Sequence, residues 1–392
     1  MVKRKICIFT GSRAEYGLLK PLMDEIKKDK ELQLQLIVSG MHMSPEFNLT
    51  YKELEKDGFK INEKIEILLS SDTPIGLSKS MGLGLISLSE AYNRLKPDII
   101  VIIGDRFEML SAVIAAMVSR IPIAHLYGGE ATFGAIDEAI RHSITKMSNL
   151  HFTAIKKYKK RIIQLGEAPK RVFNVGAIGI DNIKQLKLLT RKALEPKLGF
   201  KLNKHNLLVT FHPVTLEDDT AGKQFQNLIA ALDELNDTNI IFTGSNADTH
   251  GRIINKMIDN YVSKNPDKAK AFTSMGQTLY LSTMRFMDAV VGNSSSAIIE
   301  APSFKIGAVN IGDRQKGRIK AKNVIDCKPQ KEDIRKAIKR IYSKKFKRSL
   351  KSITNPYGNG NTAKKIKYIL KRYDVPNSLK KSFFDIDFKQ RG

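Results

Sequence analysis

Short runs rich in isoleucine, valine and leucine recur along this chain, and most end at a glycine, serine or aspartate before a longer amphipathic stretch. In the first half these runs are KICIFTGS, LQLQLIVSG, DIIVIIGDR, IPIAHLYGG, HFTAI and RVFNVGAIG. In the second half they are LLVTFHP, NIIFTGSN, AVVGNSSS and GAVNIGD. Strands that are apolar on both faces and alternate with helices form parallel sheets covered by helices. The pattern predicts an α/β protein with two Rossmann-like domains.

The length of the chain agrees with two domains. A chain of 392 residues, of which 42% are hydrophobic, is long enough for two domains of ordinary size. We place the boundary in GAIGIDNIKQL, so that the first domain is residues 1–179 and the second is residues 180–362. Helical periodicity returns near the C-terminus, and we expect the segment of about 363–392 to pack back on the first domain.

The net charge of the chain indicates which kinds of partner it can attract. The formal net charge of +26 and the pI of about 9.8 predict attraction to nucleotides, nucleic acid or an acidic membrane. The lysines and arginines are spread along the chain, and their denser runs at 156–161 and 343–351 are typical of solvated helix faces. The chain has no tryptophan and none of the recognised nucleic-acid motifs. We therefore predict no specific binding of nucleic acid.

The cysteines and the apolar segments indicate the cellular compartment of the protein. Cys7 and Cys327 are the only cysteines and lie outside any C-x-x-C pattern, so neither a disulfide framework nor a cysteine-based zinc site is expected. The N-terminal apolar run is too short for a signal peptide, and no segment approaches the ~20 apolar residues of a membrane span. These features predict a cytoplasmic protein without a membrane partner.

Carboxylates follow the predicted strands of the first half. Asp105 and Arg106 come directly after one strand, and Glu130 follows the next. Because ligands of parallel α/β sheets bind beyond the carboxyl ends of the strands, these side chains are candidates for one site. Asp137 begins the next helix. The alternative for this helix is a set of surface pairs, Asp137 with Arg141 and Glu138 with His142; we favour that alternative for Glu138 and a site role for Asp137.

Groups that can bind an anion follow other strands. The segment TGSRAEYG can open a helix whose N–H groups, with Arg13, face an anion. In GNSSSAIIEAP, Ser294 to Ser296 can donate to phosphate oxygens and Glu300 can accept from a ribose. The alternative for the serines is ordinary helix capping, and a lone strand-end histidine such as His212 is more often structural. Other polar strand ends or lining loops contain His42, Ser245, Asn246 and Arg314.

Together these motifs closely resemble those of the hydrolysing UDP-N-acetylglucosamine 2-epimerases of sialic acid biosynthesis. The matching motifs, in chain order, are GSRAEYG, GDRFE, GGE, DEAIRHSITKMSNLHF, FHPVT, GSNAD, GNSSSAIIEAP and IGDRQKGR. Non-hydrolysing relatives have a proline after the first arginine and an arginine after the histidine, whereas this chain has Ala14 and Pro213. The resemblance therefore favours the hydrolysing branch, and it covers little of the lysine-rich C-terminal region.

The resemblance implies a GT-B type fold with the sugar nucleotide in the cleft between two domains, and release of UDP and N-acetylmannosamine from UDP-N-acetylglucosamine. Departure of UDP and loss of the proton on carbon 2 give a glycal. Water then adds at carbon 1 while a proton reaches the opposite face of carbon 2. Such a reaction needs at least two titratable groups, and which carboxylate abstracts the proton stays open. The predicted catalytic residues are Asp105, Glu130, Asp137 and His212. The predicted substrate-binding residues are Arg13, His42, Arg106, Ser245, Asn246, Ser294, Ser295, Ser296, Glu300 and Arg314.

Three other functions compete with this one. The substrate of a hydrolysing epimerase can instead be UDP-2,4-diacetamido-2,4,6-trideoxyglucose, a precursor of legionaminic acid, and nothing in the residues separates the two sugars. A GT-B glycosyltransferase would share the nucleotide site but need an acceptor. A non-catalytic binding protein would gain nothing from Asp105 and Glu130 beside an anionic ligand. We predict no metal and no cofactor, and the resemblance implies a homo-oligomer, either a dimer or a tetramer.

Overall fold

The computed structural model describes residues 3–69, 73–132, 136–213, 220–245, 251–374 and 379–386. The chain divides into two compact units. The first unit comprises Met1–Glu130, Asp137–Asp181 and Tyr357–Gly392, and the second comprises Ala131–Ile136 and Asn182–Pro356. The first unit is therefore assembled from both ends of the chain.

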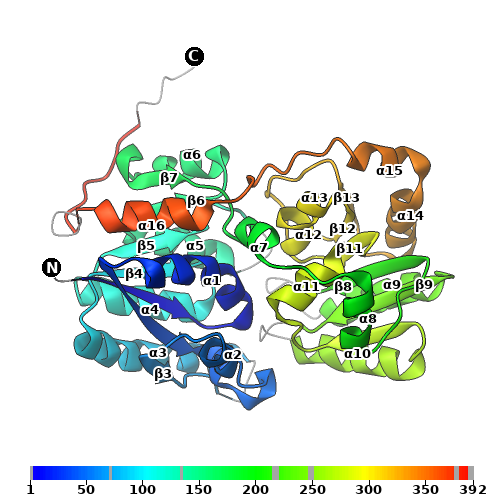
Figure 1. Ribbon diagram of the computed structural model, residues 1–392, viewed down its shortest axis with the longest axis horizontal. Helices are drawn as coiled ribbons and strands as arrows, with labels where there is room; N and C mark the ends of the chain where they lie inside the picture. Colours follow the sequence, from blue (N-terminus) through cyan, green and yellow to red (C-terminus); the bar gives the residue numbers. More distant parts are fainter. Residues whose placement is uncertain are drawn as a thin grey trace. The chain divides into compact units, whose positions relative to one another are not determined.

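The first unit is built on a parallel sheet (Figure 1). Within the described residues the sheet has seven strands in the order β3-β2-β1-β4-β5-β6-β7, and every neighbouring pair is parallel. The strands are β1 (Arg4–Thr10), β2 (Leu32–Ser39), β3 (Glu63–Ile65), β4 (Ile99–Ile103), β5 (Ile123–Leu126), β6 (Leu150–Thr153) and β7 (Val172–Asn174).

Helices cover both faces of this sheet. Successive residues of β1 belong to different cores: Ile6 and Ile8 pack into one buried cluster, and Cys7 and Phe9 pack into another. Because side chains alternate along a strand, both faces of β1 are buried, which explains its continuous apolar run. The helices are α1 (Arg13–Lys28), α2 (Tyr51–Lys56), α3 (Pro74–Leu95), α4 (Phe107–Val118), α5 (Asp137–Met147), α6 (Lys156–Gln164) and α16 (Thr362–Arg372), with short 3-10 turns η1 (Gly40–Met43), η2 (Pro45–Phe47) and η3 (Pro169–Arg171). The boundary between the two units falls within α7 (Gly179–Gln185).

The C-terminal helix α16 completes the first unit and packs on α1. The guanidinium of Arg4 donates to the carbonyl oxygens of Leu370 and Lys371, at 2.7 and 2.9 Å. At the other end of α16, the carboxylate of Asp181 accepts from the N–H groups of Thr362 and Ala363, at 3.0 and 2.8 Å. A carboxylate at this end satisfies helix N–H groups that have no partner within the helix.

The second unit repeats the same plan. Its sheet has six strands within the described residues, in the order β10-β9-β8-β11-β12-β13. The strands are β8 (His205–Thr210), β9 (Thr238–Thr243), β10 (Ala269–Phe272), β11 (Ala289–Gly292), β12 (Gly307–Ile311) and β13 (Val324–Cys327). The helices are α8 (Arg191–Leu198), α9 (Ala221–Asp233), α10 (Gly251–Lys264), α11 (Gly276–Met284), α12 (Ser296–Ile299), α13 (Ala301–Phe304), α14 (Lys331–Tyr342) and α15 (Lys344–Leu350).

The predicted fold class is confirmed, since each unit is a parallel sheet covered by helices. The sequence missed three strands, β3, β10 and β13, all of which lie at an edge of their sheet. Edge strands are only partly buried, so their sequences do not need the apolar residues on both faces that mark central strands. The sequence of β3 is EKI and that of β13 is VIDC, and neither has the continuous apolar run on which the prediction relied.

Candidate active site

The turn between β1 and α1 is held by a capping box. The hydroxyl of Ser12 accepts from the N–H of Glu15, while the carboxylate of Glu15 accepts from the N–H groups of Gly11 and Ser12, at 2.7 and 3.0 Å. This reciprocal arrangement satisfies orphan donors at the helix start. A Cβ atom at Gly11 would lie 2.6 Å from Cγ of Glu108, so this position requires glycine.

Two buried carboxylates meet beneath this turn. The guanidinium Nε of Arg106 lies 2.8 Å from Glu108 and 4.0 Å from Glu15. Burial, and after it the negative charge of Glu108, raise the pKa of Glu15 to about 8, although the positive charge of Arg106 opposes both effects. The predicted binding residue Arg106 is therefore engaged with Glu108. Sequence reasoning did not single out Glu15 or Glu108, because the contact between them joins two strand ends that are distant in sequence.

Two other predicted binding residues, His42 and Arg13, lie near the end of β1. His42 in η1 is fully buried, and its ring nitrogens lie 3.1 Å from the hydroxyl of Thr10 and 2.8 Å from that of Thr50. Burial, aided by the charge of Arg13, lowers the pKa of His42 to about 3, so its ring is neutral at pH 7. Arg13 forms an ion pair of 2.9 Å with Glu53 of α2.

Arg141 of α5 is the centre of the acidic part of the site. Its side chain is 1% exposed and contacts the carboxylate of Asp105, which follows β4. The same guanidinium donates to Glu138 at 2.6 Å and to the carbonyl oxygen of Glu130 at 3.1 Å. His142 contacts the other oxygen of Glu138 at 3.1 Å, which is the surface pair that the sequence indicated. Arg141 thus links two predicted catalytic residues, Asp105 and Glu130, and the prediction had placed it only in a helix-surface pair.

A neutral histidine supports the turns after β4 and β5. The ring of His125 lies 2.8 Å from the carbonyl oxygen of Gly104 and 3.3 Å from the hydroxyl of Thr145, and burial lowers its pKa to about 3. Gly129 has a φ of +76°, and a Cβ there would lie 2.5 Å from the carbonyl oxygen of Tyr158. The turn directly before Glu130 therefore requires glycine at position 129.

Asp137 begins α5 and is half-buried. The side chains that fix α5 on the sheet are those of Arg141, Ile144 and Thr145, which are buried. Ile136 precedes the helix and is 44% exposed. The helix therefore begins at the predicted residue, Asp137.

In the second unit, His212 and Asn293 are joined through their backbone and amide groups. The N–H of His212 donates to the side-chain oxygen of Asn293, and the side-chain amide of Asn293 donates to the carbonyl oxygen of His212, both at 2.7 Å. The carbonyl oxygen of Asn293 accepts from Arg314 at 3.2 Å and from Gln315 at 2.8 Å. Asn293 therefore ties together residues that follow β8, β11 and β12. Neither Asn293 nor Gln315 was among the predicted site residues.

The serine cluster lies beside this pair. The hydroxyl of Tyr280 lies 2.9 Å from that of Ser296, and the hydroxyl of Ser294 accepts from the N–H of Ser296 at 3.3 Å. Ser295 precedes α12, which has only four residues, and Glu300 is buried between α12 and α13. The serines therefore adjoin one short helical turn.

Ser245 is placed close to the histidine, with its hydroxyl 3.3 Å from the His212 ring. Asn246 lies outside the described residues.

Gly292, at the end of β11, packs closely against β8. A Cβ atom at Gly292 would lie 1.9 Å from the carbonyl oxygen of Thr210, and the φ of this glycine is +132°. Glycine thus allows β11 to end directly against β8, which brings Asn293 to His212.

The comparisons with known proteins identify the chain. The model of the family described as UDP-N-acetylglucosamine 2-epimerase matches residues 24–371. The chain belongs to this family. It is 49% identical over 387 residues to the GDP/UDP-N,N'-diacetylbacillosamine 2-epimerase (hydrolyzing) of Campylobacter jejuni, a match that covers 98% of this chain and 100% of the relative. It is 36% identical to the UDP-N,N'-diacetylbacillosamine 2-epimerase (hydrolyzing) of Legionella pneumophila, over 96% of this chain and 98% of the relative.

The fold of this family member has counterparts among solved structures. A UDP-GlcNAc 2-epimerase from Neisseria meningitidis bound to UDP-GlcNAc superposes with a TM-score of 0.80 at 18% identity, covering 93% of this chain and 99% of that one. The chain is thus a hydrolysing 2-epimerase of UDP-sugars, and the predicted enzyme class is confirmed. In the part of the chain that the structure describes, no helix is both long and apolar enough to cross a bilayer.

Proposed function

We propose that the substrate is the nucleoside-diphosphate derivative of N,N'-diacetylbacillosamine, the 2,4-diacetamido-2,4,6-trideoxy sugar, with UDP as the nucleotide. The observation that carries this proposal is the identity of 49% along the whole C. jejuni relative named for this sugar. The Legionella relative named for the same sugar adds support at 36%. This ranking reverses the one from sequence alone, which placed UDP-N-acetylglucosamine first. UDP-N-acetylglucosamine is the second candidate, because the family description names it.

The proposed reaction consumes one water and releases UDP and the free sugar that is epimeric at carbon 2. The bond between carbon 1 and the UDP oxygen breaks, its electron pair leaves with UDP, and the carbon 2 proton passes to a carboxylate, which leaves a glycal. Water then adds its hydroxyl to carbon 1 and gives its remaining proton to a carboxylate, while a protonated carboxyl group delivers a proton to the opposite face of carbon 2. The sugar needs no oxidant, and both proton transfers are general acid–base steps.

Asp105, Glu130 and Asp137 are the carboxylates that we propose for these transfers. Arg141 supports this assignment, since it contacts the carboxylate of Asp105 and the backbone of Glu130 from a buried position. A guanidinium group is planar and holds its N–H donors in a rigid arrangement, so it can fix the positions of both partners at once. Proton transfer depends on the placement of the groups to within about an ångström, so Arg141 is the positioning residue of this set.

His212 and its neighbours are the proposed diphosphate site. As UDP leaves, negative charge grows on its terminal oxygen, and donors that are already oriented stabilise it most. The Asn293 amide orients His212, and Ser245 holds its ring. Arg314 and the hydroxyls of Ser294 to Ser296 follow neighbouring strands of the same sheet.

The test is proton NMR of the purified protein in deuterated water with each nucleotide sugar in a separate tube. The substrates are UDP-N,N'-diacetylbacillosamine, its GDP counterpart and UDP-N-acetylglucosamine. We expect release of UDP and a free 2-epimer with deuterium at carbon 2, fastest with UDP-N,N'-diacetylbacillosamine. Faster turnover of UDP-N-acetylglucosamine would replace the proposed substrate by the second candidate. A product that retains the original proton at carbon 2 would overturn the glycal route itself.

A further inference from the structure

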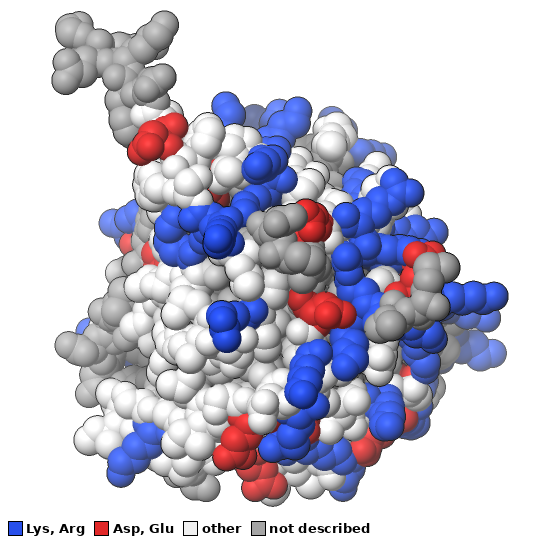
Figure 2. Space-filling model, turned by 90° about the vertical axis from the view of Figure 1, so that its left-hand side faces the viewer, with Lys and Arg blue, Asp and Glu red and all other residues white. Residues whose placement is uncertain are grey.

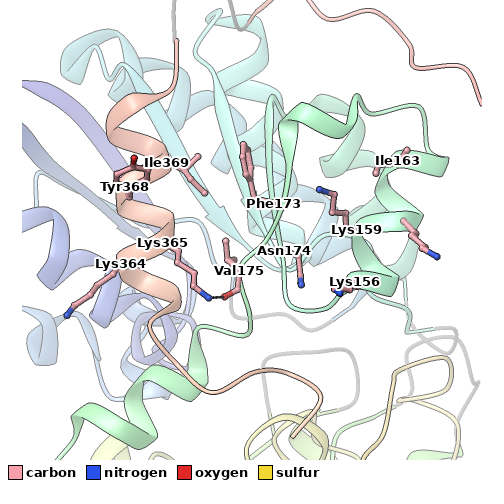
Figure 3. A pocket seen from close by; sticks show the side chains of 11 residues that line it. Lys156, Lys159, Ile163, Phe173, Asn174, Val175, Lys364, Lys365, Tyr368 and Ile369 are labelled. Carbon is pink, nitrogen blue, oxygen red and sulfur yellow. Dashed lines mark hydrogen bonds between the residues drawn. The ribbon is translucent and has the colours of Figure 1, made fainter.

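The C-terminal segment of residues 379–386 lies on the first unit, close to where α5 and α6 end. The N–H of Phe384 donates to the carbonyl oxygen of Gly166, just after α6, at 2.8 Å. The guanidinium of Arg171 donates to the carbonyl oxygen of Lys380 at 2.9 Å. None of the described residues of the segment lines the groove between α6 and α16 that Figure 3 shows. The segment is therefore attached beyond the C-terminal end of α6 and not along that groove.

A buried carboxylate lies beneath this segment. Glu167 is 1% exposed and accepts from the ammonium groups of Lys146 on α5 and Lys381 in the segment, at 2.7 and 2.9 Å. The ring of His151 on β6 lies 3.2 Å from its other oxygen. Although burial alone raises the pKa of Glu167, the hydrogen bonds from these three side chains lower it to about 2, so the carboxylate is charged at pH 7. A buried charge is costly unless it is paired, and Lys381 supplies part of that pairing.

Lys381 also reaches the C-terminal end of α5. Its Nζ donates to the carbonyl oxygens of Lys146 and Ser148, at 2.5 and 2.7 Å, and α5 ends at Met147. The last carbonyl groups of a helix have no partner within it, and a positive charge there is favourable because it faces the negative end of the helix dipole. Lys381 therefore binds the end of α5 and ties it to Glu167.

The setting of Lys381 differs from that of an ordinary surface lysine. Figure 2 shows many of the lysines and arginines at the surface on one side of the molecule, and Lys380, the neighbour of Lys381, is exposed too. The side chain of Lys381 is only 20% exposed, and burial lowers its pKa although the hydrogen bond to Glu167 opposes this effect. A partly buried ion pair is screened less by water and salt than an exposed one. The contact with Glu167 therefore holds Lys381 more firmly than an exposed pair would.

The first turns of α5 carry residues of the proposed proton-transfer site. Asp137 begins the helix, and Arg141 contacts the carboxylate of Asp105. One turn further along, the hydroxyl of Thr145 donates to the carbonyl oxygen of Arg141 at 2.9 Å and lies 3.3 Å from the ring of His125. Because a short helix moves largely as one body, a displacement of its C-terminal end also moves Asp137 and Arg141. A misplacement of about 1 Å is enough to slow a reaction strongly.

We propose that Lys381 is a positioning residue for the epimerisation, which holds the end of α5 so that the residues of its first turns keep their places relative to Asp105. Among the described residues, Lys381 forms its side-chain hydrogen bonds with the end of α5 and with Glu167, so it acts through the helix. The proposal rests on the proposed assignment of the proton-transfer carboxylates. It makes turnover depend on the C-terminal segment, whichever sugar is bound.

Chemical rescue tests the role of this ammonium group. The variant is Lys381→Cys in a Cys327→Ser background, in which the remaining Cys7 is fully buried. We expect kcat to fall about 10- to 100-fold. KM and the affinity for UDP should change little, because an interaction that serves the chemical step affects kcat and kcat/KM equally. The thiolate at position 381 then displaces bromide from 2-bromoethylamine, which forms a C–S bond and returns an ammonium group to this position, and kcat should be restored.

Lys380→Cys in the same background is the matched control, since Lys380 is the exposed neighbour on the same segment. It should keep a normal kcat before and after alkylation. An unchanged kcat in Lys381→Cys would overturn the proposal, and so would a joint loss of kcat and UDP affinity, which indicates general destabilisation. Lys381→Gln, which keeps N–H donors without the charge, decides the matter if Lys381→Cys does not fold. A wild-type kcat in Lys381→Gln would exclude the positioning role.

Combination with Arg141→Lys separates positioning from stability. Loss of Lys381 should lower kcat much less in the Arg141→Lys protein than in wild type, because the placement that it maintains is already disturbed, whereas independent effects multiply. Full multiplication of the two losses would contradict the proposal. A normal kcat of Arg141→Lys alone would reject the proposed proton-transfer site. A low kcat of Arg141→Lys together with a normal kcat of Lys381→Cys would reject only the role of Lys381.

Discussion

The guanidinium of Arg141 contacts the carboxylate of Asp105, although the two residues lie 36 positions apart and on different elements. The same group reaches the backbone of Glu130 and the carboxylate of Glu138. One buried cation therefore organises residues after β4, after β5 and on α5. Its removal should therefore disturb the placement of all three residues.

Arg141→Lys should lower turnover at least about 100-fold, because an ammonium group cannot bridge the three partners and proton transfer is sensitive to small displacements. Turnover is measured by the NMR assay, and UDP affinity by calorimetry should change little. Arg94→Lys is the matched control, since Arg94 forms an exposed pair with Glu63, and such pairs contribute at most about 1 kcal/mol. Near-normal turnover of Arg141→Lys would remove its positioning role.

Asp105→Asn and Glu130→Gln should each lower turnover about 10²–10⁴-fold, the range for loss of a general acid or base. Both should still bind UDP, because neither is placed in the proposed diphosphate site. Glu90→Gln, at an exposed carboxylate of α3, is the control for loss of one negative charge. If one of the two variants keeps wild-type turnover, that carboxylate has no part in proton transfer.

Glu15 should make the protein less stable as the pH rises. Its pKa is about 8 in the folded protein, against 4.5 for an unperturbed glutamate. Between these values the folded state holds the proton and the unfolded state does not, so the free energy of unfolding falls with rising pH. Glu15→Gln should flatten this decline and raise the melting temperature at pH 8 relative to wild type. A decline that persists in Glu15→Gln would place its origin in another group.

Asn293→Ala should weaken UDP binding about 10- to 100-fold, because two hydrogen bonds that orient His212 are lost and buried groups are left unpaired, at about 1–3 kcal/mol each. Calorimetric titration with UDP measures the effect, and circular dichroism checks the fold. Asn260→Ala, at an exposed position of α10, is the control. Unaltered UDP affinity in Asn293→Ala would separate the His212 pair from the nucleotide site.

The central strands were predictable because burial on both faces leaves a continuous apolar run, as in β4 with IIVII. That Asp105 and Glu130 contact the same buried residue, Arg141, agrees with a related expectation, since residues that follow central strands of a parallel sheet gather at one edge. Their catalytic role stays a prediction. The Glu15–Glu108 pair was not predictable, because no local pattern records which two strand ends will meet. Arg141 was visible only as a helix-surface partner, since its burial depends on how α5 lies on the sheet.

The identity of the sugar in the substrate could not be predicted from the sequence either. The two candidate sugars differ at carbons 4 and 6, and no motif of the chain has a chemistry that distinguishes an acetamido group from a hydroxyl at those positions. The ranking in favour of diacetylbacillosamine rests on overall likeness to relatives. The residues that contact carbon 4 are therefore the most useful targets for substitution once turnover is measured.

The contact of Arg4 with α16 has a consequence for folding during synthesis on the ribosome. Its partners lie 366 and 367 residues further along the chain. At synthesis rates of about 5–20 residues per second, the first strand waits roughly 20 to 70 s for the helix that covers it. The second unit is complete in sequence before the first, so it can finish folding earlier on the ribosome. Chaperones that protect exposed apolar sheet during translation should therefore meet the first unit for longer than the second.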